Sequence, residues 1–328
     1  MNENKTIGMV KNIQVFSGSV NRPFAEKVAR ELGIDLGNIR LEKFSNGEVY
    51  ARYLESVRGN DIFLIQSVAG DQVNDALMEL LIMTDAARRA SARSITAVVT
   101  HYGYARQDRK ATSREPITAK LVANLMETAG IDRIITVDLH QGQIQGFFDI
   151  PVNHLTALPI FADYFKNKHF PKDDVVVVSP DMGRAKAAKK FADLMDADVA
   201  IMHKGRPSHN KAEIQAIIGE VEDKICIIND DMIDTAGSVC AATKVLKDRG
   251  AKAVYLCATH PVFSGPAYER LENADVEEVV VCDTIPVPEE HLTGKIHVIT
   301  VAPLFAKAIW NVFSNGSVAA LFDPNYEG

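Results

Sequence analysis

Short apolar runs alternate with amphipathic stretches along nearly the whole chain. Runs of this length, rich in Val and Ile, are typical of strands that are buried on both faces of a parallel sheet. They predict strands over residues 13–16, 61–66, 95–99, 134–137, 175–178, 199–202, 225–228, 254–258, 279–282 and 296–301. Apolar residues at helical spacing predict a helix capped by Asn21 and further helices over residues 73–90, 117–128, 239–247, 267–271 and 302–313.

This alternation of strands and helices predicts the α/β class, in which crossover connections bring the strand ends to one edge of the sheet. The signals start again after residues 147–155, a segment that contains Pro151. We therefore expect two similar domains, each a mainly parallel sheet flanked by helices, over residues 1–155 and 156–313. The apolar tail, residues 314–328, is expected to pack back on the first domain.

Length and composition support a globular chain with two cores. The chain has 328 residues, of which 47% are hydrophobic and 24% charged, values that exclude disorder. A net charge of −7 argues against a general nucleic-acid binder. The four cysteines are widely spaced within apolar runs, so we expect reduced thiols. Because no signal peptide or membrane-spanning stretch is apparent, we expect a cytoplasmic protein without membrane partners.

The most informative stretch runs from residue 224 to 250. It predicts a buried strand, then an acid pair (Asp230 and Asp231), then a loop over residues 234–238, and then a helix. Such a loop directs backbone N–H groups and the helix dipole at an anion, and the hydroxyls of Thr235 and Ser238 can add donors. The acid pair suits the hydroxyls of a sugar, or Mg²⁺ held through water. A sugar phosphate fits both parts, although a plain turn capped by Asp and Ser fits the spacing as well.

Two basic segments follow predicted strands. Arg106, Arg109 and Lys110 lie among aromatic residues after the strand over 95–99, where Arg suits a polyphosphate, and the alternative is a solvated charged loop. Lys204 and Arg206 lie with Gly and Pro in residues 203–210. This composition predicts a mobile loop that closes over a charged ligand, and the alternative is a surface hairpin tip.

Isolated residues at strand ends are weaker signals. His140 follows the strand over 134–137, where a lone His is more often a capped loop residue than a ligand. Asp181 follows the strand over 175–178 and is a candidate metal ligand. Asn46 and Gly47 predict a hairpin between two strand-like runs.

Several motifs resemble those of the ribose-phosphate pyrophosphokinase family over nearly the whole chain, from about residue 13 to residue 322. They are FSNGE (44–48), YGYARQDRK (102–110), TVDLH (136–140), the basic segment around Lys204 and the acid pair with its loop (230–238). The resemblance implies two phosphoribosyltransferase-like domains. It also implies that the chain transfers the diphosphoryl group of ATP to the anomeric hydroxyl of ribose 5-phosphate, giving phosphoribosyl diphosphate and AMP for nucleotide biosynthesis.

The resemblance also implies a role for each motif. Residues of two segments are expected to contact ATP, the first of them from a neighbouring subunit: Phe44, Asn46, Gly47 and Glu48, and then Arg106, Gln107 and Asp108. His140 and Asp181 are expected to bind Mg²⁺, and Lys204 and Arg206 the transferring diphosphate. The residues expected to bind ribose 5-phosphate, besides Arg206, are Asp230, Asp231, Asp234, Thr235, Ala236, Gly237 and Ser238, with Gly237 supplying a positive φ and room for the phosphate.

Family members are expected to be hexamers with shared ATP sites, activated by phosphate and inhibited by ADP near Ser317. This chain departs from the family where Ala319 and Ala320 replace a frequent hydroxyl, where Gly205 replaces a basic residue, and where Arg184 follows Gly183 in place of a second glycine. Two alternatives remain. A phosphoribosyltransferase would have one such domain without residues 44–48 and 102–110, and a non-catalytic regulatory homologue would have an interrupted basic loop.

Overall fold

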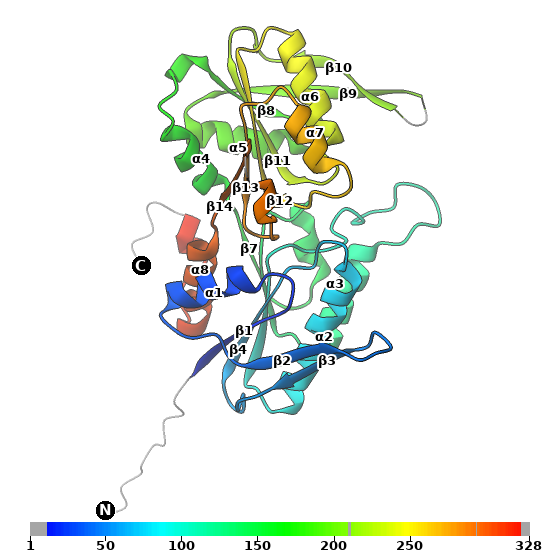
Figure 1. The fold of residues 1–328 in the computed structure, drawn as a ribbon, viewed down its shortest axis with the longest axis vertical. Coiled ribbons are helices and arrows are strands. Elements are labelled where there is room, and N and C mark those ends of the chain that lie inside the picture. Colours follow the sequence, from blue (N-terminus) through cyan, green and yellow to red (C-terminus); the bar gives the residue numbers. More distant parts are fainter. Residues whose placement is uncertain (1–11, 209–210, 293, 323–328) are drawn as a thin grey trace, which may run out of the picture.

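The computed structural model describes residues 12–208, 211–292 and 294–322, and it gives the backbone alone for residues 172, 204–208 and 211–215. The chain forms two lobes, which lie one above the other in Figure 1. Each lobe is built on its own sheet, and helices cover both faces of each sheet. The predicted α/β class with two mainly parallel sheets is confirmed.

The first lobe contains a fully parallel sheet of five strands in the order β1-β4-β5-β6-β7. Its strands are β1 (Ile13–Ser17), β4 (Asp61–Gln66), β5 (Ser94–Val99), β6 (Arg133–Val137) and β7 (Val152–Leu155). Its helices are α1 (Arg22–Leu32), α2 (Val73–Arg89) and α3 (Thr118–Ala129). An antiparallel hairpin of β2 (Ile39–Lys43) and β3 (Val49–Tyr53) turns at Gly47, whose φ of 90° confirms the predicted turn.

The second lobe contains seven strands in the order β10-β9-β8-β11-β12-β13-β14, and only β10 is antiparallel to its neighbour. These strands are β8 (Val175–Ser179), β9 (Asp198–Ser208), β10 (Lys211–Ile218), β11 (Ile225–Ile233), β12 (Ala253–Pro261), β13 (Glu278–Cys282) and β14 (Ile296–Ile299). The helices are α4 (Leu158–Lys166), α5 (Ala185–Met195), α6 (Gly237–Asp248) and α7 (Ala267–Asn273). The chain reverses its direction of progress across this sheet between β8 and β11, and ligands bind at such a switch point in open α/β sheets. The five-strand sheet of the first lobe has no such reversal.

Alternate residues of a strand pack into different hydrophobic cores, as the two-residue period of a strand requires. In β8, Val177 faces one hydrophobic cluster while Val176 and Val178 face another. The first of these clusters continues from the second lobe into the first, where it includes Val15 and Phe63. The lobes therefore share one apolar core along one face.

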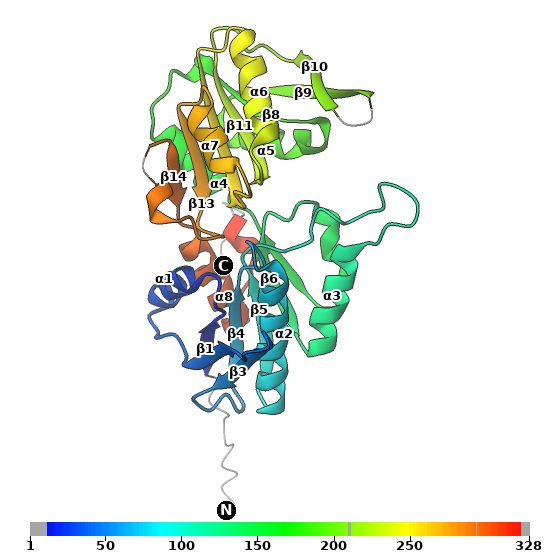
Figure 2. The same ribbon diagram turned by 45° about the vertical axis from the view of Figure 1, so that its right-hand side comes forward.

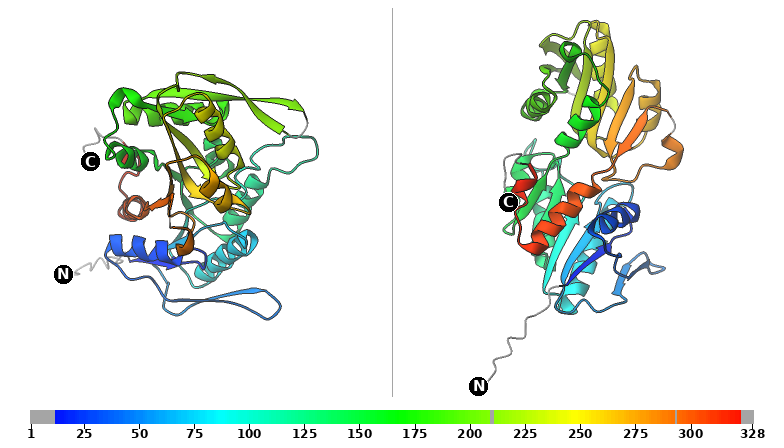
Figure 3. Two further views of the ribbon diagram at one scale, coloured as in Figure 1. Left: turned by 45° about the horizontal axis from the view of Figure 1, so that its top comes forward. Right: turned by 90° about the vertical axis from the view of Figure 1, so that its left-hand side faces the viewer.

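Helix α8 (Ala302–Ser314) follows β14 but packs against α1 of the first lobe, as the right-hand view of Figure 3 shows. The rings of Phe24 and Phe305 meet edge to face, with centroids 5.4 Å apart. The chain thus returns to the first lobe at Ala302, earlier than the boundary at residue 314 that the sequence suggested. Residues 323–328 of the expected tail lie outside the described residues.

Polar contacts also join the lobes. Asn21 precedes α1, but its side chain does not cap the helix as predicted. Its Nδ2 instead donates to the carbonyl of Asp283 (2.9 Å), a residue that follows β13. Lys27 Nζ lies 2.9 Å from Asp283 Oδ2, and Thr100 Oγ1 donates to the carbonyl of Thr284 at 2.7 Å. The side-chain amide of Asn21 therefore joins the two lobes and does not cap α1.

Other predicted features agree with the structure or are adjusted by it. The four cysteines are free thiols, and three of them are buried. Within the described residues, no helix is long and apolar enough to cross a membrane. Ser317 Oγ accepts a hydrogen bond from the N–H of Ala320 (3.3 Å), so the hydroxyl caps the short helical turn at Ala319–Phe322.

Candidate active site

A cavity of about 720 Å³ opens between the two lobes, at the edge where the parallel strands end. The first lobe contributes two segments, one after β5 and one after β6. The second lobe contributes His203 on β9, the ends of β8 and β11, and the start of α6. The strands β8 and β11 flank its switch point. The residues predicted for the site that line this cavity are Arg106, His140, Asp181, Asp230, Asp231, Asp234, Thr235, Ala236, Gly237 and Ser238.

The loop over residues 234–238 leads into the N-terminus of α6, as predicted. Ala236 has φ of 59° and begins the helix without a side-chain cap, so the first backbone N–H groups of α6 remain directed at the cavity. The positive φ predicted for Gly237 is therefore wrong, because the left-handed residue is Ala236. Gly237 supplies space instead: a Cβ there would lie 3.3 Å from Arg270 Nη1.

Arg270, which sequence reasoning missed, holds this loop from behind. Its Nη1 donates to the carbonyl of Thr235 (2.9 Å) and fixes the peptide that precedes the left-handed residue Ala236. Arg270 lies on α7, and a lone Arg on a short exposed helix carries no signal in the sequence. Only the packing of α7 beside α6 brings it to the loop.

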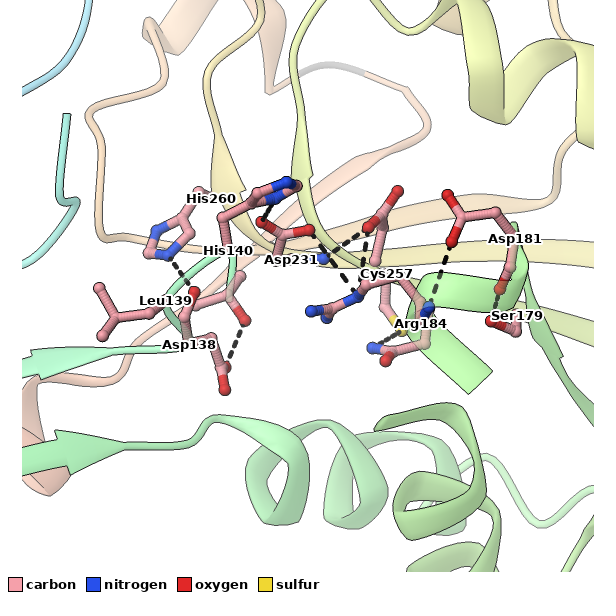
Figure 4. Close-up of polar contacts among 12 residues, drawn as sticks. Asp138, Leu139, His140, Ser179, Asp181, Arg184, Asp231, Cys257 and His260 are labelled. Carbon is pink, nitrogen blue, oxygen red and sulfur yellow. Dashed lines mark hydrogen bonds and ion pairs between the residues drawn. The ribbon is translucent and has the colours of Figure 1, made fainter. Parts of the chain in front are cut away.

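The acid pair lies on β11 itself and not in a loop, because β11 continues to Ile233, beyond the predicted end at residue 228. Asp230 and Asp231 are neighbours on this strand, and both border the same cavity. Asp231 is almost fully buried, and its Oδ2 lies 2.9 Å from His140 Nδ1. Figure 4 shows this contact crossing from the first lobe to the second.

The acid pair and His140 alter one another's proton affinity. The hydrogen bond to Asp231 raises the pKa of His140, although burial opposes the change. Burial favours the neutral form of Asp231, but the hydrogen bond from His140 and the charge of Arg184 lower its pKa below the usual value. Burial and the neighbouring charge of Asp231 raise the pKa of Asp230. One negative charge of the pair is therefore strongly held on Asp231.

Arg184, which the sequence could not place, lies beside this acid pair. Its Nε is 3.5 Å from Asp230 Oδ1 and 3.8 Å from Asp231 Oδ1. The backbone N–H of Arg184 donates to Asp181 Oδ1 (3.1 Å), so Asp181 caps the short turn that leads into α5. Figure 4 shows Arg184 between Asp181 and Asp231.

The turn that carries His140 is held by groups of both lobes. Asp138 has φ of 37°, and its Oδ2 accepts from Thr259 Oγ1 (2.6 Å) and from the N–H of Ala157 (2.9 Å). His154 Nε2 accepts from the N–H of Leu139 at 2.9 Å. His140 is therefore positioned by a hydrogen-bonded turn and is not a loosely attached loop residue.

The segment after β5 reaches the cavity through its arginines. Arg106 Nη1 lies 2.7 Å from Asp234 Oδ2, which joins the predicted ATP segment to the loop before α6. Arg109 also lines the cavity. Gln107 and Asp108 do not: Gln107 Oε1 accepts from Thr118 Oγ1, and Asp108 Oδ2 accepts from Gln143 Nε2 (3.3 Å).

Residues 44–48 do not line the cavity. They form the tip of the β2–β3 hairpin, which Figure 1 shows at the lower end of the first lobe. Phe44 is 56% exposed and contacts Tyr50 edge to face.

The segment with Lys204 and Arg206 was expected as a loop, but its backbone forms the end of β9, paired with β10. The pairing is irregular, with register shifts between Lys211 and Glu213 and again before Ala216. The side chains of Lys204 and Arg206, and all of residues 209–210, lie outside the described part of the structure. Figure 2 shows the hairpin projecting on the side where the segment between β5 and α3 leaves the first lobe.

The predicted metal ligands His140 and Asp181 lie on opposite sides of Asp231 in Figure 4. Within the described residues, no group of three His, Cys, Asp or Glu side chains is arranged to hold a metal ion. This donor set suits Mg²⁺, which keeps several waters and takes one or two protein ligands together with substrate phosphates. Because Asp231 accepts from Nδ1 of His140, Nε2 carries the lone pair of the neutral ring.

Fold and site together define a class: a two-lobed α/β protein whose cavity brings a helix N-terminus together with carboxylates and arginines. Comparison with known proteins is more specific. A profile for the N-terminal domain of ribose phosphate pyrophosphokinase matches residues 13–130, and one for the phosphoribosyl synthetase-associated domain matches residues 208–323. The chain belongs to the ribose-phosphate pyrophosphokinase family.

Individual relatives match over almost their whole length. A ribose-phosphate pyrophosphokinase of Fusobacterium nucleatum is 51% identical over 312 residues, which cover 95% of this chain and 98% of the relative. One of Clostridium acetobutylicum is 52% identical with the same coverage. The crystal structure of phosphoribosylpyrophosphate synthetase from Mycobacterium smegmatis superposes with a TM-score of 0.87 at 44% identity, covering 93% of this chain and 100% of that one.

Proposed function

We propose that this protein transfers the diphosphoryl group of ATP to the anomeric hydroxyl of ribose 5-phosphate, giving phosphoribosyl diphosphate and AMP for nucleotide biosynthesis. The observation that carries this proposal is the convergence of three binding elements in one cavity. The loop over 234–238 with the α6 N-terminus suits the 5-phosphate, the acid pair suits ribose hydroxyls, and Arg106 and Arg109 suit a polyphosphate. A sugar phosphate and a nucleotide are thus brought together between the lobes.

The reaction requires positioning and charge neutralisation more than covalent chemistry. The oxygen of the anomeric hydroxyl attacks the β-phosphorus and loses its proton to solvent. The bond between this phosphorus and the oxygen that bridges to the α-phosphate breaks, AMP leaves, and the developing charge lies on phosphoryl oxygens. His140 and Asp181 would hold Mg²⁺, which would supply charge neutralisation at the diphosphate. Lys204 and Arg206 are assigned to the same diphosphate by family resemblance, and Gln107 and Asp108 to the nucleotide. Because His140 is assigned to the metal by family resemblance, we assign no general base.

The test is the release of AMP from ATP by the purified protein, with and without ribose 5-phosphate. We expect AMP and phosphoribosyl diphosphate in equal amounts, and no AMP without the sugar phosphate. A phosphoribosyltransferase would instead consume phosphoribosyl diphosphate in the presence of a nucleobase. A regulatory homologue would release no AMP under either condition. Two features favour the synthetase over both: the two-lobed fold, and a basic segment that keeps Lys204 and Arg206 in the sequence without an insertion.

The assembly is part of the same proposal. The exposed Phe44 at the hairpin tip lies outside the cavity of its own chain, which supports a role for residues 44–48 in the ATP site of a neighbouring subunit. We accordingly propose a hexamer in the cytoplasm, with phosphate and ADP as regulatory ligands near Ser317. Sedimentation of the full chain with and without ATP tests the assembly.

A further inference from the structure

Each cation that faces a carboxylate in the cavity comes from a different segment. Arg106 lies 2.7 Å from Asp234, and His140 lies 2.9 Å from Asp231. Both residues come from the first lobe: family resemblance assigns Arg106 to ATP and His140, through Nε2 of its neutral ring, to the metal.

Arg184 differs in origin and in depth. It comes from the second lobe, like the acid pair that it faces at 3.5 and 3.8 Å. Its side chain is 16% exposed, against 57% for Arg106 and 28% for His140. The side chain is also tied to a fixed backbone, because its own N–H bonds Asp181 and α5 begins at the next residue. Of these three side chains, Arg184 is thus the most buried, and it belongs to the same lobe as the acid pair.

The contact between Arg184 and the acid pair is one of charge. Within the described residues, Arg184 Nε is buried and makes no hydrogen bond. A buried guanidinium that is not hydrogen bonded through Nε contributes through its electric field, which acts on both carboxylates at once.

We propose that Arg184 is the permanent counter-cation of the acid pair, which keeps a divalent cation away from Asp230 and Asp231 and reserves their oxygens for sugar hydroxyls. Two adjacent carboxylates without a counter-charge are the kind of oxygen ligands that Mg²⁺ and Mn²⁺ prefer. A fixed positive charge a few Å away repels such an ion, so the metal is left to the diphosphate side of the cavity. This inference rests on the proposed function for the identity of the sugar, and it makes Arg184 a positioning residue.

The test is Mn²⁺ binding to the nucleotide-free full chain. Binding is measured as the loss of the spectroscopic signal of free Mn²⁺. We expect Arg184→Met and Arg184→Gln to bind Mn²⁺ about tenfold or more tightly than the unmodified protein. Arg184→Lys should restore the original weak binding, and adding Asp230→Asn to Arg184→Met should remove the gain. Lys186→Met, which removes an exposed positive charge two residues away and outside the cavity, is the matched control and should change nothing.

Kinetics give a second readout. In Arg184→Met, Mg²⁺ in excess over ATP should become a competitive inhibitor against ribose 5-phosphate, with KM for the sugar rising about tenfold and KM for ATP unchanged. Unaltered Mn²⁺ binding in both substitutions would overturn the inference. So would a fall in kcat with both KM values unchanged, which would place Arg184 on the phosphoryl groups. The Mn²⁺ titration uses no substrate, so its result stands or falls separately from the proposed reaction.

Discussion

At the scale of residues, the charged side chains of the cavity are positioned mainly by partners from elsewhere in the fold. His140 is held by Asp231, and Arg106 by Asp234, in each case across the lobe boundary. Arg270 likewise fixes the carbonyl of Thr235 from a separate helix. Substitutions at these positions should therefore change the binding of one substrate more than the stability of the whole protein.

Gly237→Val tests the space beside the loop. The added side chain would displace Arg270, since even a Cβ lies 3.3 Å from its Nη1, and it would crowd the N–H groups at the start of α6. We expect KM for ribose 5-phosphate to rise by about tenfold or more, with KM for ATP nearly unchanged, when each substrate is titrated separately. Gly237→Ala is the graded control, and its KM for ribose 5-phosphate should lie between those of the unmodified protein and Gly237→Val. Equal losses for both substrates would indicate general misfolding and contradict the assignment.

Arg270→Ala tests the support of the loop. Because Arg270 is exposed, its hydrogen bond is screened by water, so we expect KM for ribose 5-phosphate to rise at most about tenfold. Ala236→Gly should recover part of this loss, because glycine adopts φ of 59° without strain. The four proteins of this cycle are compared by ribose 5-phosphate titration. Strict additivity would mean that Arg270 does not act through the turn at Ala236.

At the scale of elements, strand ends and one helix start organise the cavity, while two hairpins project from the body. The strands β8 and β11 place their ends at the switch point, and α6 adds its N-terminus there. The β2–β3 and β9–β10 hairpins carry residues that the family resemblance assigns to ATP and to the diphosphate. The left-hand view of Figure 3 shows both hairpins extending toward the same side of the molecule. Such projecting elements suit contacts with substrate or a neighbouring subunit.

Lys204→Ala tests the β9–β10 hairpin. A cation that acts only as charge develops is worth roughly 2.7–4 kcal/mol, so we expect kcat to fall about a hundredfold to a thousandfold. ATP affinity should remain nearly intact in equilibrium binding. Lys211→Ala, on the paired strand, is the control and should keep its activity. A Lys204→Ala protein that kept a third of its activity would show that Lys204 is only a surface residue.

At the scale of the whole molecule, a shared core and a buried polar junction hold the lobes together. His260 of the second lobe is part of this junction. Its Nε2 lies 3.2 Å from the carbonyl oxygens of Val137 and Asp138, and the centroids of its ring and the ring of His101 are 4.8 Å apart. Burial lowers the pKa of His260 to about 3. Burial also lowers the pKa of His101, although the hydrogen bond between His101 and the carbonyl of Val68 opposes this change. Both rings are therefore neutral in the folded protein at neutral pH.

This neutrality predicts acid sensitivity. Between about pH 6.5 and pH 3 the unfolded chain binds a proton on His260 and the folded chain does not, so the free energy of unfolding falls as the pH falls, by about 1.4 kcal/mol per pH unit. In His260→Gln we expect lower stability at pH 7 but a flatter dependence below pH 6.5. Urea unfolding of the metal-free protein from pH 7 to pH 4 measures both. Parallel curves would show that the residues facing His260, namely His101, Asp138 and Asp231, account for the acid effect.

Local patterns in the sequence were sufficient for the α/β class, most strands and helices, and the loop before α6. Strand periodicity and turn chemistry depend on neighbouring residues, so the turn at Gly47 could be predicted from them. The family resemblance then predicted which strand ends carry chemistry. Ten of those residues line one cavity: Arg106, His140, Asp181, Asp230, Asp231, Asp234, Thr235, Ala236, Gly237 and Ser238.

Tertiary structure decided what depends on distant partners. The extension of β11 to Ile233 required pairing with β12, as Ile233 lies beside Pro261. The use of Asn21 between the lobes, the support from Arg270 and the place of Arg184 beside Asp230 each join residues far apart in the chain. The sequence specifies the charge and the hydrogen-bonding groups of each side chain. Which partner satisfies them is set by packing, because burial makes an unpaired polar group costly and so selects the partner that the fold brings near.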